Sequence, residues 1–408
     1  MNVFAAIVGL AALVLIHEAG HFFTAIWVGM RPRSFNIGFG PPLAKTTRKG
    51  ILYAVRAVPL GGYVKIPGMH RPAASDLEVH FSRALQEVPE LVGPVDRVRR
   101  RLDQVERDPE DVQAELERLR EAVVAAPLSA AALDPALRGL EDVSDAASPE
   151  AYWRQRTWKR VAVVAAGPAI NILVAILLFT VLFMTGGGKA TSTVDAVLPD
   201  HPAAAAGLRP GDTILVIDNR PVNSPSDIPT RIQASQGRPI TLGVQRDGNR
   251  LRLGPVRPYK DTDGKYRLGF QLRGESLGFP AAFWQSVKLT GIVTREIGKS
   301  LAGLVHKSQR KQLSSTVGIV QASSNAANQG IAQYMWVLGL ISLSLALFNL
   351  LPLLPLDGGH IVFSLIEGLR GRAVGRAVYE RASAIGIALM LLLFVVGLSN
   401  DIGRLSGG

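Results

Sequence analysis

Long apolar runs separated by polar stretches dominate the pattern of this 408-residue chain. The first run extends from Val3 to Met30, and further runs cover about 161–184, 334–351 and 382–398. Each is long enough for a helix to cross a bilayer, which takes about 17–25 apolar residues. The pattern therefore predicts a multi-pass α-helical membrane protein. With their flanks, the four predicted transmembrane segments are residues 1–30, 154–186, 331–357 and 382–400.

The first run lacks a basic leading segment and a small-residue cleavage site, and we expect it to be retained rather than removed as a signal peptide. Residues 31–84 follow it, and within them Ile51–Gly68 is rich in Ile, Val and Tyr. This pattern predicts a β-hairpin with its turn at Pro59 and Gly61-Gly62. The hairpin either re-enters the membrane or lies in the cytosol.

Residues 85–153 place apolar side chains at helical spacing among alternating charges, and Pro109 interrupts them. We expect a cytosolic insert of two solvated helices, followed by a flexible alanine-rich and acidic stretch. The insert is expected to be structural or to dock a partner, and not to be catalytic. No function is assigned to the loop of residues 358–381.

Short β patterns separated by Gly and Pro turns fill residues 190–273. Within them, HPAAAAGLRPGDTILVIDNRPV resembles the signature of a PDZ domain, so an α+β domain is expected here. PDZ domains hold extended peptides by strand addition, and this groove either binds a peptide, acts as a steric filter or is unused. Residues 274–330 are predicted to form an amphipathic helix at the outer membrane surface and a connector.

Positive charge is concentrated beside the apolar runs. The chain has a net charge of +12, and its basic clusters lie at 31–49, 154–160 and 370–381. The positive-inside rule then places 31–153 and 358–381 in the cytosol and 190–330 outside. Such clusters favour a lipid bilayer as the partner and not nucleic acid. The absence of cysteine excludes disulfides and thiolate ligands, so a metal would need His, Asp or Glu.

The first apolar run contains the motif His17-Glu18-Ala19-Gly20-His21. On a helix the two imidazoles lie one turn apart on one face and can hold a single metal ion. Glu18 can then accept a proton from a water that the ion activates. Ionisable groups in hydrocarbon are costly and usually functional. The alternative is a polar patch that only ties helices together.

A catalytic zinc site usually has three protein ligands and one open position. Asp357 is the best third candidate, because it follows Pro352 and Pro355 at the cytosolic end of the third span. Two alternatives are that Asp357 only caps a helix and that His360 takes its place. Asn171 and Asn349, polar residues in apolar spans, could bind substrate or tie helices together. Gly167 and Pro168 could let another helix approach closely or could loosen the second span.

Three ordered motifs, HEAGH, GPAIN and NLLPLLPLDGG, together resemble the site-two protease family of intramembrane zinc metalloproteases. The resemblance extends over the four spans, the GGYVKIPG segment and the PDZ-like region. It implies that Zn²⁺ is bound by His17, His21 and Asp357, and that Glu18 is the catalytic base. It also implies that substrate is positioned by Asn171, Asn349, Gly61, Gly62 and Tyr63.

The single PDZ-like region matches the bacterial branch of that family, which cleaves anti-sigma factors in regulated intramembrane proteolysis. The resemblance thus implies a protease of the bacterial inner membrane that cuts single-span membrane proteins, either anti-sigma factors or remnant signal peptides. The insert of residues 85–153 departs from the family pattern. Two other classes remain, a catalytically silent PDZ adaptor and a divalent-metal transporter, although neither needs Glu18 beside His17.

Overall fold

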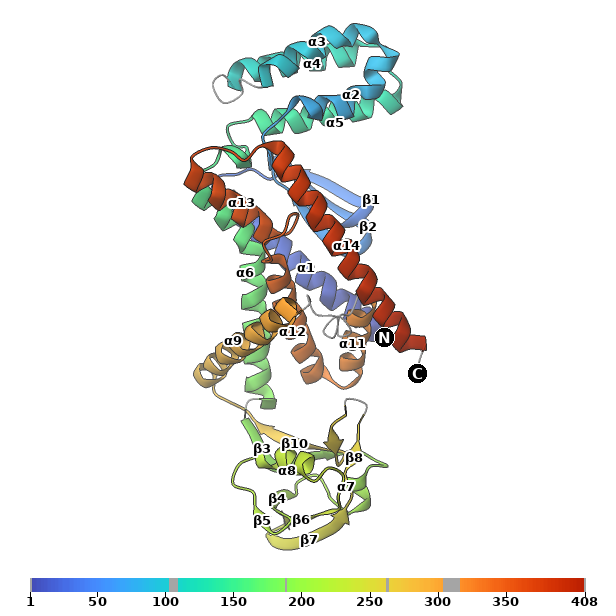
Figure 1. Cartoon of the computed structure of the whole chain (residues 1–408), viewed down its shortest axis with the longest axis vertical. Helices are drawn as coiled ribbons and strands as arrows, with labels where there is room; N and C mark the ends of the chain where they lie inside the picture. The colour runs from blue at the N-terminus through green and yellow to red at the C-terminus, as the bar shows by residue number, and fades with distance from the viewer. Residues whose placement is uncertain (1, 103–108, 188, 262–263, 304–315, 407–408) are drawn as a thin grey trace. The chain divides into compact units, whose positions relative to one another are not determined.

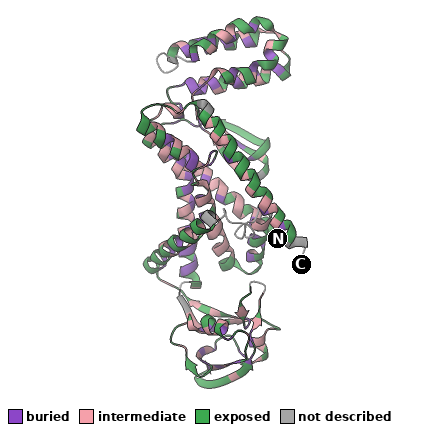
Figure 2. Ribbon diagram, viewed as in Figure 1, coloured by how far each residue is buried: buried purple, intermediate pink, exposed green. Residues whose placement is uncertain are grey.

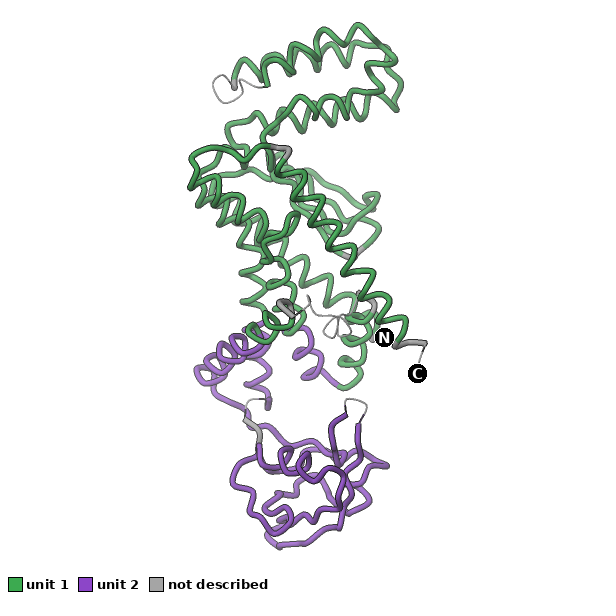
Figure 3. The backbone as a smooth tube through the Cα atoms, in the orientation of Figure 1, with its two compact units in different colours: residues 1–174, 294–329, 340–408 green, residues 175–293, 330–339 purple. Residues whose placement is uncertain are grey.

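The computed structural model describes residues 2–102, 109–187, 189–261, 264–303 and 316–406 (Figure 1). The predicted insert and connector include residues 103–108 and 304–315, which lie outside the described residues. The chain divides into two compact units, shown in Figure 3. Unit 1 comprises residues 1–174, 294–329 and 340–408, and unit 2 comprises residues 175–293 and 330–339.

Four helices of the described chain are long and apolar enough to cross a membrane, and they match the four predicted spans. These helices are α1 (Asn2–Trp27), α6 (Thr157–Leu182), α12 (Ile331–Asn349) and α14 (Arg376–Ser406). A short π-helical segment, η3 (Phe183–Gly187), continues α6. Many of their apolar side chains point outward, such as Phe23 and Leu391, which are 67% and 59% exposed. Figure 2 shows such exposed positions along α14. Outward apolar side chains suit helices whose surroundings are lipid.

Three further helices are α9 (Phe279–Gly303), α11 (Thr316–Asn328) and α13 (Asp357–Arg370). Between α12 and α13 the chain is non-helical, because Pro352 and Pro355 cannot continue the helix. The N-cap of α13 is Leu356, so Asp357 is its first helical residue. The possibility that Asp357 serves only as a helix cap is therefore wrong.

Residues 31–84 contain a β-hairpin, but it is not the one predicted within Ile51–Gly68, because most of that segment forms a single strand. Strands β1 (Ser34–Arg48) and β2 (Ile51–Lys65) are joined at Lys49 and Gly50, both with positive φ. Ser34 pairs with both Leu52 and Lys65, so the first half of β1 lies between the two halves of β2. The turn expected at Pro59 and Gly61-Gly62 is wrong, because the two apolar halves of β2 pair with β1 instead of with each other.

The insert contains more helices than the two that were expected. Its helices are α2 (Ala74–Glu87), α3 (Val92–Leu102), α4 (Pro109–Ala125) and α5 (Ala130–Ala147), with a 3₁₀ turn η1 (Pro89–Leu91). It therefore begins at Ala74 and not at residue 85, and the alanine-rich stretch expected to be flexible is α5. Ala132, Ala136 and Leu140 recur every fourth residue and are buried in a core with Phe81. That burial stabilises α5. A 3₁₀ turn, η2 (Tyr152–Arg154), leads into α6.

Unit 2 contains a six-stranded sheet in the order β10-β3-β4-β6-β7, with β5 paired to β4, and all of these pairs are antiparallel. Its strands are β3 (Lys189–Val197), β4 (Thr213–Ile217), β5 (Arg220–Pro221), β6 (Ile240–Arg246), β7 (Asn249–Val256) and β10 (Phe270–Glu275). Two short strands, β8 (Tyr259–Lys260) and β9 (Tyr266–Arg267), pair separately. Helices α7 (Pro202–Ala205) and α8 (Asp227–Ala234) complete this part, and Ile228 and Ile232 of α8 join the apolar core of the sheet.

Candidate metal centre

Helix α1 presents two imidazoles to one point inside unit 1. His17 and His21 are four residues apart, so they lie on the same face of the helix. Their rings meet edge to face, and their Nε2 atoms are 3.2 Å apart. Both side chains are buried, with 5% and 9% of each residue exposed.

The carboxylate of Asp357, from the start of α13, completes this cluster. Its Oδ2 lies 3.2 Å from Nε2 of His17 and 3.4 Å from Nε2 of His21. The three ligand atoms lie within 4.8 Å of one another. Among the described residues, this buried Oδ2 has no hydrogen-bond partner. Two imidazole nitrogens and a carboxylate oxygen that converge in this way fit the donor set of a catalytic zinc ion.

Helix α6 fixes how the two imidazoles are oriented. Nδ1 of His21 donates to the carbonyl oxygen of Val163 at 2.8 Å, which leaves Nε2 unprotonated and free for a metal. Nδ1 of His17 lies 3.3 Å from the amide group of Asn171. With the amide oxygen turned toward His17, Asn171 would accept from Nδ1 and leave that Nε2 free as well. Both contacts orient the imidazoles of the candidate metal ligands, as hydrogen bonds behind metal sites do.

Glu18 lies between the imidazoles and the sheet of unit 1. The backbone N–H of Val64 on β2 donates to its carboxylate. A Cβ atom on Gly62 would lie 3.4 Å from Cγ of Glu18 and only 2.7 Å from the carbonyl oxygen of Asn36. Glycine at position 62 therefore allows β2 to pass between β1 and Glu18.

A cavity of about 370 Å³ opens onto these groups. Its lining includes His17, Glu18, His21, Tyr63, Asn349, Asp357 and His360. Nδ2 of Asn349 lies 3.3 Å from Nε2 of His17. The ring of Tyr63 stacks on Phe39, with centroids 6.3 Å apart.

Four of the sequence candidates, Gly62 among them, lie outside this cavity or are otherwise engaged. Asn171 is completely buried behind His17 and does not line the cavity. Gly61 packs against the ring of Phe39 with φ of +137°. His360 lines the cavity, but its Nδ1 contacts the hydroxyl of Tyr379 at 2.5 Å. The described metal-ligand cluster contains Asp357 and not His360.

Comparison with known proteins gives a result that is consistent with a zinc site. The model of peptidase family M50 matches residues 5–393. A "Putative zinc metalloprotease" of Rhizobium meliloti (strain 1021) is 31% identical over 416 residues, covering 98% of this chain and 95% of that protein. A protein of the same description from Agrobacterium fabrum is 32% identical over 418 residues, covering 98% and 94%. The "Metalloprotease MmpA" of Caulobacter vibrioides is 27% identical over 427 residues, covering 97% and 94%.

Proposed function

Since the chain belongs to peptidase family M50 and is a membrane zinc metalloprotease, we propose that it cuts peptide bonds inside the transmembrane segments of single-span membrane proteins. One observation carries this proposal. Two histidines from a helix long enough to span a bilayer converge with Asp357, and Glu18 lies beside them. The ligands meet at one point instead of following a path through the membrane, which favours a hydrolase over a metal transporter.

We assign the metal-binding role to His17, His21 and Asp357. Zinc supplies Lewis-acid chemistry when bound, because it polarises a carbonyl and lowers the pKa of a coordinated water to about 7. The protein holds both imidazoles by their Nδ1 atoms, with Val163 and Asn171 as partners. We therefore assign Asn171 to orienting His17, and not to contacting substrate.

Glu18 is the proposed general base. Its carboxylate accepts a proton from a water in the cavity and later returns the proton to the leaving amine of the cut peptide. The N–H of Val64 holds this carboxylate beside His17. Because the carboxylate is already held in position, the proton transfer does not require a further loss of side-chain conformational entropy.

The substrate must be unwound where it is cut, because a helix shields its own peptide bonds. We propose that the Gly62–Lys65 end of β2 holds the unwound segment by strand addition, replacing the hydrogen bonds that the helix loses. Tyr63 and Asn349 line the adjoining cavity and would contact the substrate there.

We propose that the insert and the β1–β2 sheet lie in the cytosol and that the sheet of unit 2 lies outside, which the basic flanks of the spans support. We propose that residues 190–273 form a PDZ domain that governs access of substrates. The membrane is proposed to be the bacterial inner membrane, and the substrates anti-sigma factors or remnant signal peptides.

The test compares bound zinc and cleavage of a single-span test protein for the wild type, Glu18→Gln and His21→Ala. Glu18→Gln keeps all three ligands, so it is expected to retain zinc and to lose cleavage by at least 10²-fold. His21→Ala should lose both. A Glu18→Gln protein that still cuts the test protein would refute the assignment of the base.

A further inference from the structure

Two cavities of unit 1 share part of their lining. The first is the cavity that contains the candidate metal ligands, and the second has a volume of about 620 Å³. Met69 and His360 line both cavities. Tyr379 and His70 line the second cavity and not the first. The imidazole of His360 therefore lies between the two cavities.

Tyr379 of α14 orients this imidazole. Its hydroxyl lies 2.5 Å from Nδ1 of His360, and the described residues offer the hydroxyl proton no other acceptor. The hydroxyl therefore donates to Nδ1, which assigns the proton of the neutral ring to Nε2. The two ring nitrogens point in opposite directions, and Tyr379 belongs to the second cavity. The N–H of Nε2 consequently points toward the first cavity, where the metal centre lies.

Helix α13 holds His360 beside the metal centre. Asp357 and His360 are three residues apart, so they lie on the same face of the helix. Gly358 lies between them, and a Cβ atom there would be only 2.2 Å from the carbonyl oxygen of Leu350, just after α12. The glycine lets this first turn of α13 pack directly on the backbone that leads into it. That packing fixes the position of His360 relative to Asp357.

Few hydrogen-bond donors face the scissile bond in the first cavity. Besides the candidate metal ligands, the described lining contains three side chains with an N–H or O–H group, which are Tyr63, Asn349 and His360. Tyr63 belongs to β2, and the amide nitrogen of Asn349 lies 3.3 Å from Nε2 of His17. His360 is thus the donor that a residue outside the cavity orients, independently of the metal ligands.

Peptide hydrolysis creates a negative charge that such a donor stabilises. The oxygen of water bonds to the scissile carbon, a proton of the water passes to Glu18, and the π electrons of the carbonyl move onto its oxygen. This charge develops in a cavity whose lining already contains the carboxylates of Glu18 and Asp357. A fixed N–H that points at the oxygen stabilises the charge in the transition state and therefore raises kcat.

We propose that His360 is a catalytic residue, which donates a hydrogen bond from Nε2 to the carbonyl oxygen of the scissile peptide, and that Tyr379 positions it. This inference rests on the proposed function. The role differs from that of a metal ligand, because removal of the donor leaves His17, His21 and Asp357 in place. Zinc content therefore separates the two roles.

The experiment measures kcat, KM and bound zinc for the full-length protein in vesicles, with a single-span test protein as substrate. His360→Ala is expected to lower kcat by about 10²–10³-fold, as the loss of one oxyanion donor does, with KM and zinc unchanged. His360→Gln places an amide N–H near the position of Nε2 and should recover kcat by at least about tenfold. His360→Asn is one methylene shorter, places its amide near Nδ1, and should remain as slow as His360→Ala.

Tyr379→Phe tests the positioning role. It should lower kcat by about tenfold in the wild type and have no further effect in the His360→Ala protein, because the two residues act as a unit. His70→Ala is one control, since its ring packs edge-on against Tyr379, with centroids 4.3 Å apart, but does not line the first cavity.

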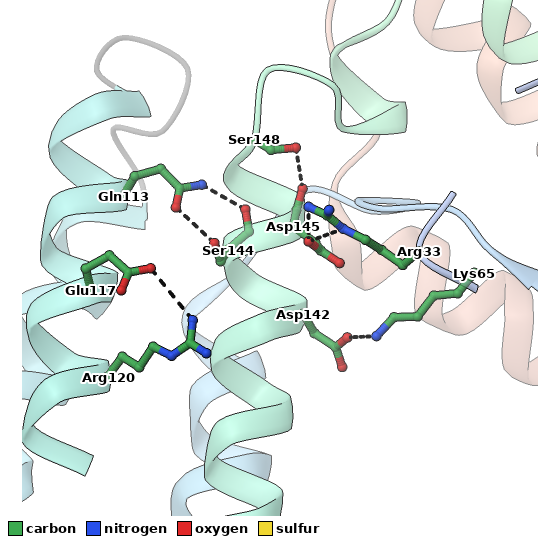
Figure 4. Close-up of polar contacts among 9 residues, drawn as sticks. All are labelled: Arg33, Lys65, Gln113, Glu117, Arg120, Asp142, Ser144, Asp145 and Ser148. Atoms are coloured by element: carbon green, nitrogen blue, oxygen red, sulfur yellow. Dashed lines mark hydrogen bonds and ion pairs between the residues drawn. The ribbon is translucent and has the colours of Figure 1, made fainter. Parts of the chain in front are cut away.

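Asp142→Asn is a control for general loosening of unit 1. It breaks an ion pair between α5 and β2, in which Oδ1 of Asp142 lies 2.5 Å from Nζ of Lys65 (Figure 4). Neither residue lines the first cavity. Both control variants should therefore keep kcat within about twofold of the wild type, as substitutions away from a site do.

Loss of zinc in His360→Ala would make His360 a metal ligand and would overturn the proposal. Equal kcat values for His360→Gln and His360→Asn, or a wild-type kcat for His360→Ala, would also overturn it. If the wild type does not cut the test protein, or if Glu18→Gln cuts it equally well, the proposed function itself fails. If Glu18→Gln is inactive and His360→Ala is fully active, only the role of His360 fails.

Discussion

Gly167 on α6 packs directly against the imidazoles of His17 and His21, and there is no space for a side chain at this position. A Cβ atom at this position would lie 2.3 Å from Nε2 of His21 and 2.8 Å from Cε1 of His17. Such distances are far below van der Waals contact, so any side chain must push the imidazoles away. The close approach of α6 to α1 therefore depends on glycine here.

Gly167→Ala is expected to displace both Nε2 atoms and to weaken zinc binding by about 10–100-fold, as changes just behind metal ligands do. Alanine favours the helix itself by about 1 kcal/mol, so unfolding of α6 would not explain the loss. Zinc titration of the purified protein measures the effect. Gly291→Ala on α9 is the control, because no atom lies within 4 Å of its added Cβ. Wild-type zinc affinity in Gly167→Ala would contradict this account.

The sequence was sufficient to predict the side chains of the site, but not the groups that form hydrogen bonds with them. Helical periodicity predicts that His17 and His21 lie on one face. The position of Asp357 at the end of the third span predicts that it lies at the same depth in the membrane as the two histidines. The carbonyl of Val163 and the N–H of Val64 could not be predicted, since backbone groups leave no signature in the sequence. Asn171 was recognised as unusual, but its contact with His17 depends on how the helices pack.

At the scale of secondary-structure elements, a buried ion pair links the start of β4 to β6 in the sheet of unit 2. Asp212, just before β4, is fully buried, and its two oxygens each lie 2.7 Å from nitrogen atoms of Arg246 on β6. Burial alone would raise the pKa of Asp212. The hydrogen bonds from Arg246 and from the N–H of Arg209 outweigh it, so the pKa lies below its usual 3.8.

Asp212→Ala is therefore expected to destabilise the sheet by about 3 kcal/mol, because it leaves Arg246 without a carboxylate and with only the carbonyl oxygen of Gly207 as acceptor. The lowered pKa means that the wild type has this stabilisation above pH 3.8 and loses it as the pH falls toward the folded-state pKa. Amide hydrogen exchange in β4 and β6 measures both effects. Asp195→Ala, which removes an exposed pair with Arg273, should cost less than about 1 kcal/mol. Equal effects of the two substitutions would show that burial is unimportant.

Secondary-structure elements could be predicted where their surroundings allow only one pattern of apolar and polar residues. Lipid requires long apolar helices, so the four spans followed from hydropathy. The β1–β2 turn did not, because the apolar halves of β2 look like partners in sequence whereas β1 lies between them. In α5 the alanines suggested flexibility, and only the core of the insert shows that Ala132 and Ala136 are buried.

On the scale of the whole molecule, every proposed zinc ligand and the base belong to unit 1, whereas the six-stranded sheet belongs to unit 2. The two ends of that sheet domain meet, since Lys189 of β3 pairs with Glu275 of β10. A short Gly-Ser linker can therefore replace residues 190–274, because paired strands lie about 4.8 Å apart.

This deletion is expected to leave zinc binding intact and to change which membrane proteins are cut. Zinc content and the cleaved proteins in cells are the measurements, with a same-length linker inserted beside the intact domain as the control. An unchanged set of cleaved proteins would refute a role of the sheet domain in access. Loss of zinc would refute the independence of the metal centre from this domain.

The central claim is that a water hydrolyses peptide bonds at membrane depth beside His17, His21, Asp357 and Glu18. Its most direct test is mass spectrometry of the fragments produced from a single-span test protein in vesicles, with Glu18→Gln as the blank. The account predicts one new pair of termini within the apolar segment, absent from the Glu18→Gln sample. Termini only in the water-exposed flanks, or the same termini with Glu18→Gln, would contradict it.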